Sequence, residues 1–490
     1  MRTNYVHFST PQFRLLSNNQ IEELHLATLQ ILERTGVAFD CEEANDILGE
    51  AGADVSNPQR VKIPSFLVEQ ALRTAPKIIT LYTREGEPAM VLNGMTGSHF
   101  GASVDSLDFL DPYTRQRRPC YAEDISDTAR LADALPNIEW LLAAGSSSTL
   151  PAAVADKVAL LQSILNSSKP IAASLPGGVS SLREALKVCS MVAGGEKELH
   201  AKPFFIGLTN SVSPLTQGKD AMEKSLLCAE KGIPNRVQPM PMAGATVPAT
   251  LPGVLAIGNA EFLSQLVVIQ LKKPGAPVIY GSLPTIMDMK TAIFTYGAPE
   301  MSFLVAAHTE MSHYYKLPIV GTAGATDARS IGAQAATEIT YQILMTVLSG
   351  ADLIHDVGLA YHGALVSPEL VVLSDEIIDM VKVAMGGLEI NDETLPLDLI
   401  DRIGPGGNYI SESHTLKHFR KFWVPTIFDR SRIEREGTKD CEELLNEKTL
   451  RILETYQPKP LPEDLVKELK EVEGTWFKQV GLEHVYPKRE

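Results

Sequence analysis

The chain has 490 residues, 44% of them hydrophobic, which is enough for a large buried core. Its 60 acidic residues outnumber its 44 basic ones, and the resulting net charge of −16 argues against nucleic acid or an anionic membrane as the partner. The five cysteines are widely spaced and form no CxxC pair, which excludes a disulfide framework and a zinc cluster and indicates a reducing compartment.

Targeting signals give the same indication of the compartment. Residues 1–13 contain no apolar signal core. We find no run of about 18 apolar residues of the kind that spans a membrane. We therefore expect a cytoplasmic protein.

The first 96 residues combine helical and strand-like patterns. Apolar residues between 18 and 36 recur at helical spacing, and further helices are predicted at 42–51 and 64–75. Residues 77–92 alternate between apolar and polar as two strands joined by a turn. We predict that residues 1–96 form an α+β cap.

From residue 97 onwards, short apolar runs recur at regular intervals, and each is followed by a helical stretch. The predicted strands are 98–104, 138–144, 170–174, 204–209, 236–240, 278–282, 319–322 and 353–356. The predicted helices are 124–134, 153–165, 182–193, 219–231, 254–272, 300–315, 333–348 and 369–385. Eight strand–helix units predict an α/β protein with a (β/α)8 TIM barrel over residues 97–387. An open doubly wound sheet is the alternative, disfavoured because no GxGxxG follows a strand and the repeat is even.

The predicted strands end in small hydroxyl and amide side chains. In a barrel these ends meet at one mouth. The strand-end residues are Ser146 to Ser148, Ser174, Thr209 to Ser211, Gln238, Tyr280, Ser282, Thr322, His355 and Asp356. The pattern contains no HxH pair, strand-end lysine or facing carboxylate pair, which metal hydrolases and Schiff-base aldolases normally show.

Two stretches, 317–334 and 351–363, combine a buried strand with a chemically active turn. Asp327 follows the first strand, and His355 and Asp356 end the second. Asp327 could simply cap the following helix, and His355 could simply pack against its neighbours. Because both follow consecutive strands of one βαβ unit, we favour function and take all three as catalytic candidates.

Residues 388–490 are predicted to be a C-terminal helical extension packed on the barrel. His414 and His418 lie four residues apart, on one face of a predicted helix, a spacing that suits a metal. Because no third ligand is nearby in the sequence, we expect no metal site.

Six segments, in order along the chain, resemble one family. They are NAEFLS at 259–264, VIYGS at 278–282, GAPE at 297–300, YKLP at 315–318, GATDAR at 324–329 followed by Gln334, and SGAD at 349–352. With them the chain resembles the trimethylamine methyltransferase (MttB) superfamily over nearly its full length. The resemblance implies a (β/α)8 barrel that moves a methyl group from a methylamine to the cobalt of a corrinoid. That corrinoid is carried by a separate small protein, so we expect a cognate corrinoid-protein partner and no tightly bound cofactor of the chain's own. We also expect a homo-oligomer.

One position departs from the founding members of this family. Those trimethylamine enzymes carry pyrrolysine three residues before the aspartate of the motif, and counting back from Asp327 gives Gly324. Members without pyrrolysine demethylate quaternary amines such as glycine betaine. The resemblance therefore implies a quaternary amine, a betaine, as the substrate here.

A quaternary ammonium is already activated, because it leaves as a neutral amine and needs no added proton. The protein must then align the N–CH3 bond with the cobalt, exclude water and supply aromatic faces for the cation. Aromatic candidates are Phe100, Tyr280 and Tyr361, although aromatic residues also fill barrel mouths as packing.

The carboxylate of a betaine needs a donor, and His355 could approach the substrate or the cobalt. Candidate donors are Arg329, His99 and His362. Arg329 could equally pair with Asp327 or Glu338, and His355 could be a neutral histidine bonded to Asp356.

Two other functions stay open: another barrel enzyme, such as a lyase or a metal-dependent hydrolase, and a non-catalytic betaine-binding protein.

Overall fold

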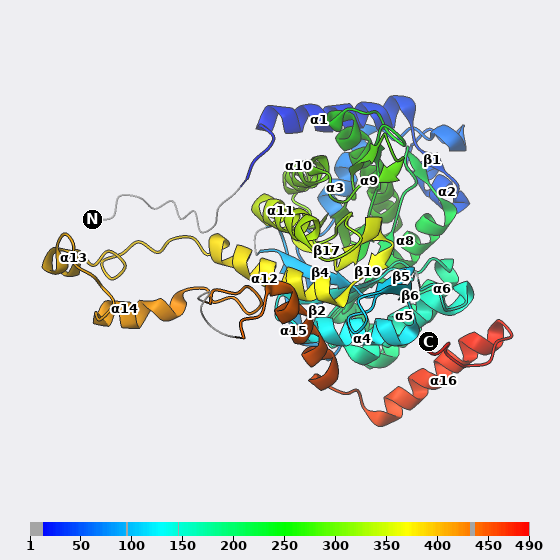
Figure 1. Ribbon diagram of the computed structural model, residues 1–490. Coiled ribbons are helices and arrows are strands. Elements are labelled where there is room, and N and C mark those ends of the chain that lie inside the picture. Colours follow the sequence, from blue (N-terminus) through cyan, green and yellow to red (C-terminus); the bar gives the residue numbers. More distant parts are fainter. Residues whose placement is uncertain (1–12, 95–96, 146, 432–436, 490) are drawn as a thin grey trace.

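The structure is a computed structural model that describes residues 13–94, 97–145, 147–431 and 437–489. Its centre is a closed barrel of eight parallel strands that neighbour one another in chain order (Figure 1). The strands are β4 (His99–Ser103), β7 (Ile138–Ala143), β8 (Ile171–Ala173), β9 (Phe205–Thr209), β11 (Asn235–Val237), β13 (Val278–Gly281), β16 (Ile319–Thr322) and β17 (Leu353–Val357). The predicted (β/α)8 barrel is therefore confirmed, and the open sheet is excluded.

Alternate residues of each strand fill the barrel interior. The inward side chains form one apolar cluster, which includes Trp140, Leu142, Ile206, Leu208, Ile279, Val320 and Leu353. Gly101 makes room for the largest of them, since a Cβ there would lie 2.3 Å from Cε2 of Trp140. The interior is thus packed, and the polar strand ends lie on top of an apolar floor.

A ring of helices surrounds the barrel close to the predicted positions. They are α4 (Ala122–Ala134), α5 (Ala152–Asn166), α6 (Gly178–Ala193), α8 (Lys219–Lys231), α9 (Leu251–Lys272), α10 (Pro299–Tyr315), α11 (Ala333–Ser349) and α12 (Pro368–Met385), with a short α7 (Glu196–Ala201) after α6. Helix α9 is long and apolar enough to cross a membrane, but 89% of its most apolar window is buried inside the protein. Its hydrophobicity is that of a core helix.

The N-terminal segment covers both the side and the bottom of the barrel. Helices α1 (Asn18–Gln30), α2 (Glu42–Glu50) and α3 (Ser65–Thr74) pack against α9, with η1 (Ile31–Thr35), η2 (Pro58–Arg60) and the short parallel pair β1 (Ala38–Phe39) and β10 (Thr216–Gln217) between them. The antiparallel hairpin β2 (Ile79–Tyr82) and β3 (Pro88–Leu92) sends Ile79, Leu81, Met90 and Leu92 into the interior cluster. The predicted boundary at residue 96 falls on 95–96, outside the described residues.

Two small sheets, built by the loops that follow the strands, lie over the mouth. One joins β5 (Asp108–Leu110) and β6 (Arg117–Pro119), after β4, to β18 (Leu359–Ala360) and β19 (Leu365–Val366), after β17. The other joins β12 (Met242–Ala243) to β14 (Thr285–Asp288) and β15 (Ile293–Phe294). The turn η3 (Tyr361–Gly363) lies between β18 and β19. These loops cover the polar strand ends and shield them from solvent.

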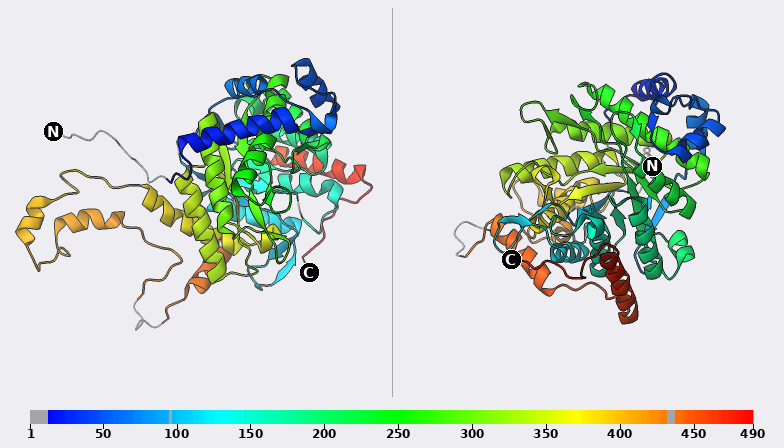
Figure 2. Two further views of the ribbon diagram at one scale, coloured as in Figure 1. Left: turned by 90° about the horizontal axis from the view of Figure 1, so that it is seen from above. Right: turned by 90° about the vertical axis from the view of Figure 1, so that its right-hand side faces the viewer.

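The C-terminal extension divides into two parts. Residues 386–422, which we call the arm, project away from the body and carry α13 (Leu397–Ile403), α14 (Ser413–His418) and η4 (Phe419–Lys421) (Figures 1 and 2). Helix α15 (Cys441–Thr455) packs on α12 and α4, and α16 (Glu463–Gln479) packs on α5 and α6. The expectation that the extension packs on the barrel is therefore wrong for the arm.

Candidate active site

A buried row of three polar side chains crosses the barrel mouth from β11 to β17. Arg236 pairs in register with Leu208 and Ile279, whose side chains fill the interior, so its own side chain also points inward. Its Nη2 lies 2.6 Å from Nε2 of His355. Nδ1 of His355 lies 2.6 Å from Oδ1 of Asp356. Arg236, His355 and Asp356 thus form one connected set.

Burial fixes the protonation of His355. Burial and the neighbouring Arg236 guanidinium lower the pKa of His355 to about 4, so the ring is neutral at physiological pH. A guanidinium can only donate, so Nε2 of His355 must accept, and the ring proton sits on Nδ1, facing Asp356. The lone pair of the imidazole is therefore already occupied, and His355 is not available as a general base.

Asp356 carries the negative charge of the set. Burial opposes its ionisation, but interaction with His355 and the Arg236 charge hold the pKa of its carboxyl below the usual value. Oγ1 of Thr322 donates to its Oδ2 at 2.8 Å, and the Tyr296 hydroxyl also interacts with this carboxylate. Asp356 has φ of +76°, a left-handed conformation that is strained for a residue with a side chain. The fold holds this strain at the point where the strand meets the mouth.

Arg236 has few partners for a buried cation. The side chain is 1% exposed, and its Nε and Nη1 have no hydrogen-bond acceptor among the described residues. Burial lowers the pKa of Arg236 to about 10, while Asp356 and Tyr296 act in the opposite direction, so the guanidinium remains charged at neutral pH. The mouth therefore presents a cation with unused donors.

Asp327 organises a loop. Its two carboxylate oxygens accept from the backbone N–H groups of Tyr296 and Gly297, each at 2.8 Å. Nδ1 of His362 lies 2.9 Å from its Oδ1. Helix α11 begins at Ala333, with Gly332 at its N-cap, so the alternative that Asp327 caps this helix is wrong. Asp327 instead holds the backbone of Tyr296, whose hydroxyl reaches Asp356.

Three predicted substrate contacts lie away from the mouth. Phe100 is outward-facing, since it alternates with Gly101, which contacts Trp140 inside the barrel. Tyr280 is also outward-facing, and its hydroxyl interacts with Asn259 of α9 and His308 of α10. His99 begins β4 at the opposite end of the barrel, with its Nδ1 2.5 Å from Glu139 Oε2. These placements correct the expectation that the three side chains face the substrate.

Tyr361 and Arg329 lie together above the mouth. The guanidinium carbons of Arg117 and Arg329 lie over the Tyr361 ring, 4.8 and 5.4 Å from its centroid. Arg329 thus stacks on an aromatic ring, and the structure shows no ion pair between it and Asp327 or Glu338. Glu338 instead accepts from the backbone N–H of Asp327 at 2.9 Å. Because two cations already occupy Tyr361, a substrate ammonium would be repelled there.

Sequence reasoning missed Arg236 and Tyr296. The available signal for Arg236 was a charged residue at the start of an apolar run predicted to be a buried strand. Tyr296 immediately precedes the GAPE segment at 297–300, but it follows the short strand β15 in a loop whose path the sequence does not indicate. Its ring lies 5.1 Å from that of Phe294, so this loop brings two aromatic side chains together.

Gly324 is held in a conformation that leaves no room for a side chain. Its φ is +89°, and a Cβ would lie 2.8 Å from Cγ2 and 3.0 Å from Cα of Val357. A long side chain at this position would have to displace β17. The chain therefore presents backbone atoms and no side chain at position 324.

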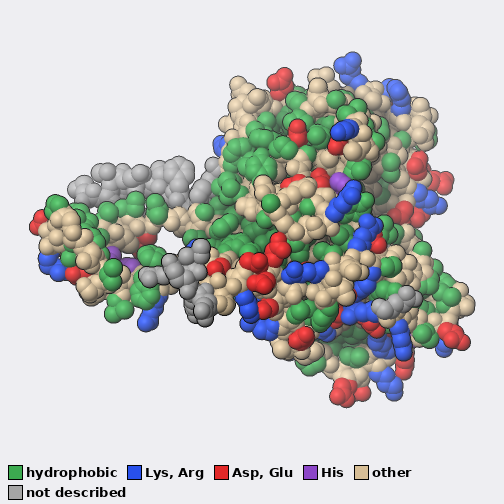
Figure 3. Space-filling model, viewed as in Figure 1, with side chains coloured by type: hydrophobic (Ala, Val, Ile, Leu, Met, Phe, Trp, Pro, Cys, Tyr) green, Lys and Arg blue, Asp and Glu red, His purple; other side chains and the backbone are tan. Residues whose placement is uncertain are grey.

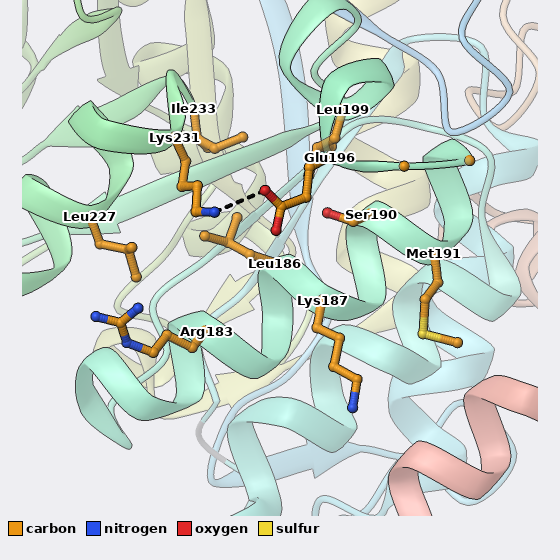
Figure 4. A pocket seen from close by; sticks show the side chains of 12 residues that line it. Arg183, Leu186, Lys187, Ser190, Met191, Glu196, Leu199, Leu227, Lys231 and Ile233 are labelled. Atoms are coloured by element: carbon orange, nitrogen blue, oxygen red, sulfur yellow. Dashed lines mark hydrogen bonds and ion pairs between the residues drawn. The ribbon is translucent and has the colours of Figure 1, made fainter.

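Other clusters lie outside the mouth. A surface cavity of about 670 Å³ lies between α6, α7 and α8, rimmed by Arg183, Lys187 and the Lys231–Glu196 ion pair (Figure 4). Within the described ranges, no three His, Cys, Asp or Glu side chains gather as a metal-binding group. His414 and His418 instead contact Glu393 inside the arm, His414 through the backbone carbonyl and His418 through the carboxylate.

Comparison with known proteins gives consistent matches over the whole chain. The sequence model of the family described as trimethylamine methyltransferase (MTTB) matches residues 1–473. A trimethylamine methyltransferase of Desulfitobacterium hafniense is 35% identical, covering 93% of this chain and 92% of that protein. A glycine betaine methyltransferase of the same species is 29% identical, covering 96% of this chain and 99% of that protein. A trimethylamine methyltransferase of Methanosarcina thermophila is 31% identical, covering 94% and 96%.

Solved structures share the fold. The monomethylamine methyltransferase of Methanosarcina barkeri superposes with a TM-score of 0.52 at 11% identity, covering 96% of this chain and 89% of that chain. A hydroxylamine complex of MtmB gives a TM-score of 0.53 at 12% identity, with the same coverage. At this identity the likeness shows the fold alone.

Proposed function

We propose, because this chain belongs to the trimethylamine methyltransferase (MTTB) family, that it is a methyltransferase acting on a quaternary amine. The methyl group would go to a corrinoid carried by a separate partner protein. When bound, that corrinoid supplies the nucleophile that accepts the methyl group. The contribution of this chain is to bind the amine, orient its N–CH3 bond and exclude water.

One observation carries this proposal: the mouth has a histidine that cannot act as a base. The lone pair of His355 is taken by Arg236, and its proton faces Asp356. A substrate that needed proton transfer in the mouth would find no free imidazole in this set. A quaternary ammonium needs none, because its leaving group is a neutral amine.

The remaining side chains suit a cation that must be held without hydrogen bonds. The ring of Tyr296, whose hydroxyl interacts with Asp356, supplies an aromatic face, and the Asp356 carboxylate supplies negative charge. Burial of His355 and Asp356, at 2% and 3% exposed, keeps bulk water away from the reacting bond. We assign Tyr296 and Asp356 to the ammonium, and Asp327 to positioning Tyr296.

Support for the finer identity of the substrate comes from the site. The relatives include a trimethylamine methyltransferase at 35% identity and a glycine betaine methyltransferase at 29%, so sequence identity does not favour a betaine. The site itself favours a betaine, because Gly324 provides no side chain where the founding trimethylamine enzymes carry pyrrolysine. Protonated trimethylamine is also costly to desolvate, whereas an aromatic wall can replace the weak hydration of a quaternary ammonium.

We also propose that the chain associates with a second copy of itself through the arm. Large apolar side chains of the arm are exposed, including Leu388 at 91% and Ile410 at 87% (Figure 3). The first half of the arm is mainly acidic and its last part is basic, as in LDLID at 397–401 and KHFRK at 417–421. An antiparallel pair of arms would therefore bring opposite charges together and bury apolar surface.

The test follows methylcobalamin formation by absorbance when purified protein meets free Co(I) cobalamin and one amine at a time. We expect at least one betaine to be demethylated and trimethylamine to be left unchanged. Faster turnover of trimethylamine than of any betaine would overturn the substrate assignment. Tight binding of a betaine, with no demethylated product under these conditions or with a corrinoid protein present, would indicate a binding protein instead.

A further inference from the structure

We infer that Arg236 binds a carboxylate of the substrate, so that the enzyme selects quaternary amines that carry a carboxylate over equally methylated amines that lack one. The inference deepens the proposed function and rests on it. Its first basis is the hydrogen-bonding capacity of the guanidinium. Nε and Nη1 are buried and have no acceptor among the described residues, and Nη2 donates to His355 at 2.6 Å.

One fork of the guanidinium remains available. Nη2 carries two N–H groups, and His355 takes one of them. One N–H of Nη2 is parallel to the N–H of Nε, and the other is parallel to an N–H of Nη1. The N–H that His355 leaves free therefore always has a parallel neighbour. Both Nε and Nη1 are unused. A carboxylate is the ligand whose two oxygens match such a parallel pair.

The charges of the mouth also match a zwitterion. Arg236 is positive, Asp356 is negative and His355 is neutral, so the set as a whole carries no net charge. A betaine adds one positive and one negative group, each of which meets its opposite. A cation such as choline would approach Asp356 but leave the Arg236 donors unused and add uncompensated positive charge to a buried site.

His355 and Asp356 have a positioning role in this arrangement. Nε2 of His355 accepts from Nη2 of Arg236 and so fixes one edge of the guanidinium. Nδ1 of His355 lies 2.6 Å from Oδ1 of Asp356, and this contact keeps Nε2 of the imidazole turned towards Arg236. The same carboxylate therefore orients the arginine indirectly while remaining next to Tyr296.

The experiment compares matched ligand pairs in binding to the whole protein, measured by calorimetry without corrinoid. The pairs are glycine betaine with choline, proline betaine with N,N-dimethylpyrrolidinium, and γ-butyrobetaine with butyltrimethylammonium. For at least one pair we expect the wild type to bind the carboxylated member at least about 100-fold more tightly. Arg236→Gln should reduce this ratio to below about 10-fold, mainly by weakening the carboxylated member.

Control variants separate the inference from a loss of fold. Arg183→Gln, on the exposed face of α6 at the rim of the surface cavity, should keep the wild-type ratio. Arg236→Lys keeps the positive charge but lacks the parallel N–H pair, so its affinity ratio should lie between those of Arg236→Gln and the wild type. If Arg236→Gln does not fold, the wild-type ratios and Arg236→Lys decide the question.

The outcomes are distinguishable from failure of the proposed function. If the wild type binds no carboxylated amine more tightly than its matched cation, or if Arg236→Gln keeps the wild-type ratio, the inference is overturned even when methyl transfer is observed. If carboxylated amines are selected through Arg236 but no methyl transfer follows with any corrinoid acceptor, the inference stands and the proposed function falls.

Discussion

At the scale of single residues, the mouth is defined by what its side chains already do for one another. Nε2 of His355 accepts from Arg236, and its Nδ1 lies 2.6 Å from Asp356. The carboxylate of Asp327 accepts from two backbone N–H groups and contacts His362. Neither side chain is free to move protons. Both instead fix the direction of a neighbour, which is Arg236 for His355 and Tyr296 for Asp327.

The neutrality of His355 predicts a particular pH dependence. Its pKa falls from 6.5 to about 4 on folding, so between these values the unfolded chain binds more protons than the folded one. The free energy of unfolding is therefore unaffected by this residue above pH 6.5. It decreases as the pH falls towards 4, by up to about 3 kcal/mol. The urea midpoint of the wild type should fall more over this range than that of His355→Gln, whose amide oxygen can still accept from Arg236. Parallel pH dependences would show that the imidazole is not held neutral.

Substrate binding should show no such dependence between pH 6 and 8. The pKa values of Arg236 and Asp356 leave both groups charged across this range, and His355 stays neutral. Calorimetric titration of the preferred betaine at several pH values checks this expectation. A loss of affinity centred near pH 6.5 would mean that a histidine with an ordinary pKa contacts the substrate.

Asp327→Asn should disturb both stability and binding. The amide retains one acceptor oxygen, so one of the N–H groups of Tyr296 and Gly297 loses its partner, at a cost of about 1–3 kcal/mol. The loop that carries Tyr296 becomes looser, so KM should rise more than kcat falls. Asp392→Asn, in the exposed arm, is the matched control and should leave both quantities unchanged. If the two variants had the same stability and the same KM, the hydrogen bonds of Asp327 would support neither the fold nor substrate binding.

At the scale of elements, the hairpin β2–β3 closes the end of the barrel opposite the mouth. Leu81 and Leu92 are fully buried among the inward side chains of the strands. Asp352, just before β17, accepts from the backbone N–H of Asn93, Gly94 and Ile319, which ties the exit of the hairpin to the start of β16. The apolar floor beneath Arg236 therefore depends on a segment far away in the sequence.

Truncating the hairpin should weaken the whole barrel. Leu81→Ala leaves a cavity in the interior cluster, and we expect a loss of about 2–5 kcal/mol in the free energy of unfolding, seen as a lower denaturation midpoint. Ile78→Ala, 61% exposed beside the same strand, should cost little. If Leu81→Ala were as stable as Ile78→Ala, the hairpin would not be part of the barrel core.

At the scale of the whole molecule, the arm is the part that lies apart from the body of the chain (Figures 1 and 2). It leaves α12 after Met385, and the chain returns to the same helix where Trp423 Nε1 donates to Asp379 at 2.7 Å. Glu376 of α12 then accepts from the backbone N–H of Thr426 and Ile427. The excursion is therefore anchored at its base, while its apolar side chains remain exposed.

Charge placed on the arm should separate the subunits. Leu388→Asp combined with Ile410→Asp should convert an oligomer into monomers in light scattering, with no change in thermal midpoint beyond that caused by the loss of association. Leu26→Asp, 51% exposed on α1, tests whether any surface charge has the same effect and should leave the oligomer intact. A wild-type chain that is monomeric at micromolar concentration would refute self-association through the arm.

The sequence alone indicated the barrel, because each strand and each helix must bury its own apolar residues and so carries its own periodicity. The predicted helix 219–231 coincides with α8 (Lys219–Lys231), and all eight predicted strands are present. The polar strand end also drew attention to His355 and Asp356. These features depend on local periodicity, which is readable without knowing how the elements meet.

Only the tertiary structure decided which side chains face the mouth. Adjacent strand residues point to opposite sides, so an error of one position turned Phe100 and Tyr280 from packing residues into supposed ligands. Closure of the barrel brought Arg236 within 2.6 Å of His355, across 119 positions of sequence. The path of the arm was likewise decided by tertiary structure, because its short helices bury too little surface for the sequence pattern to indicate what they pack against.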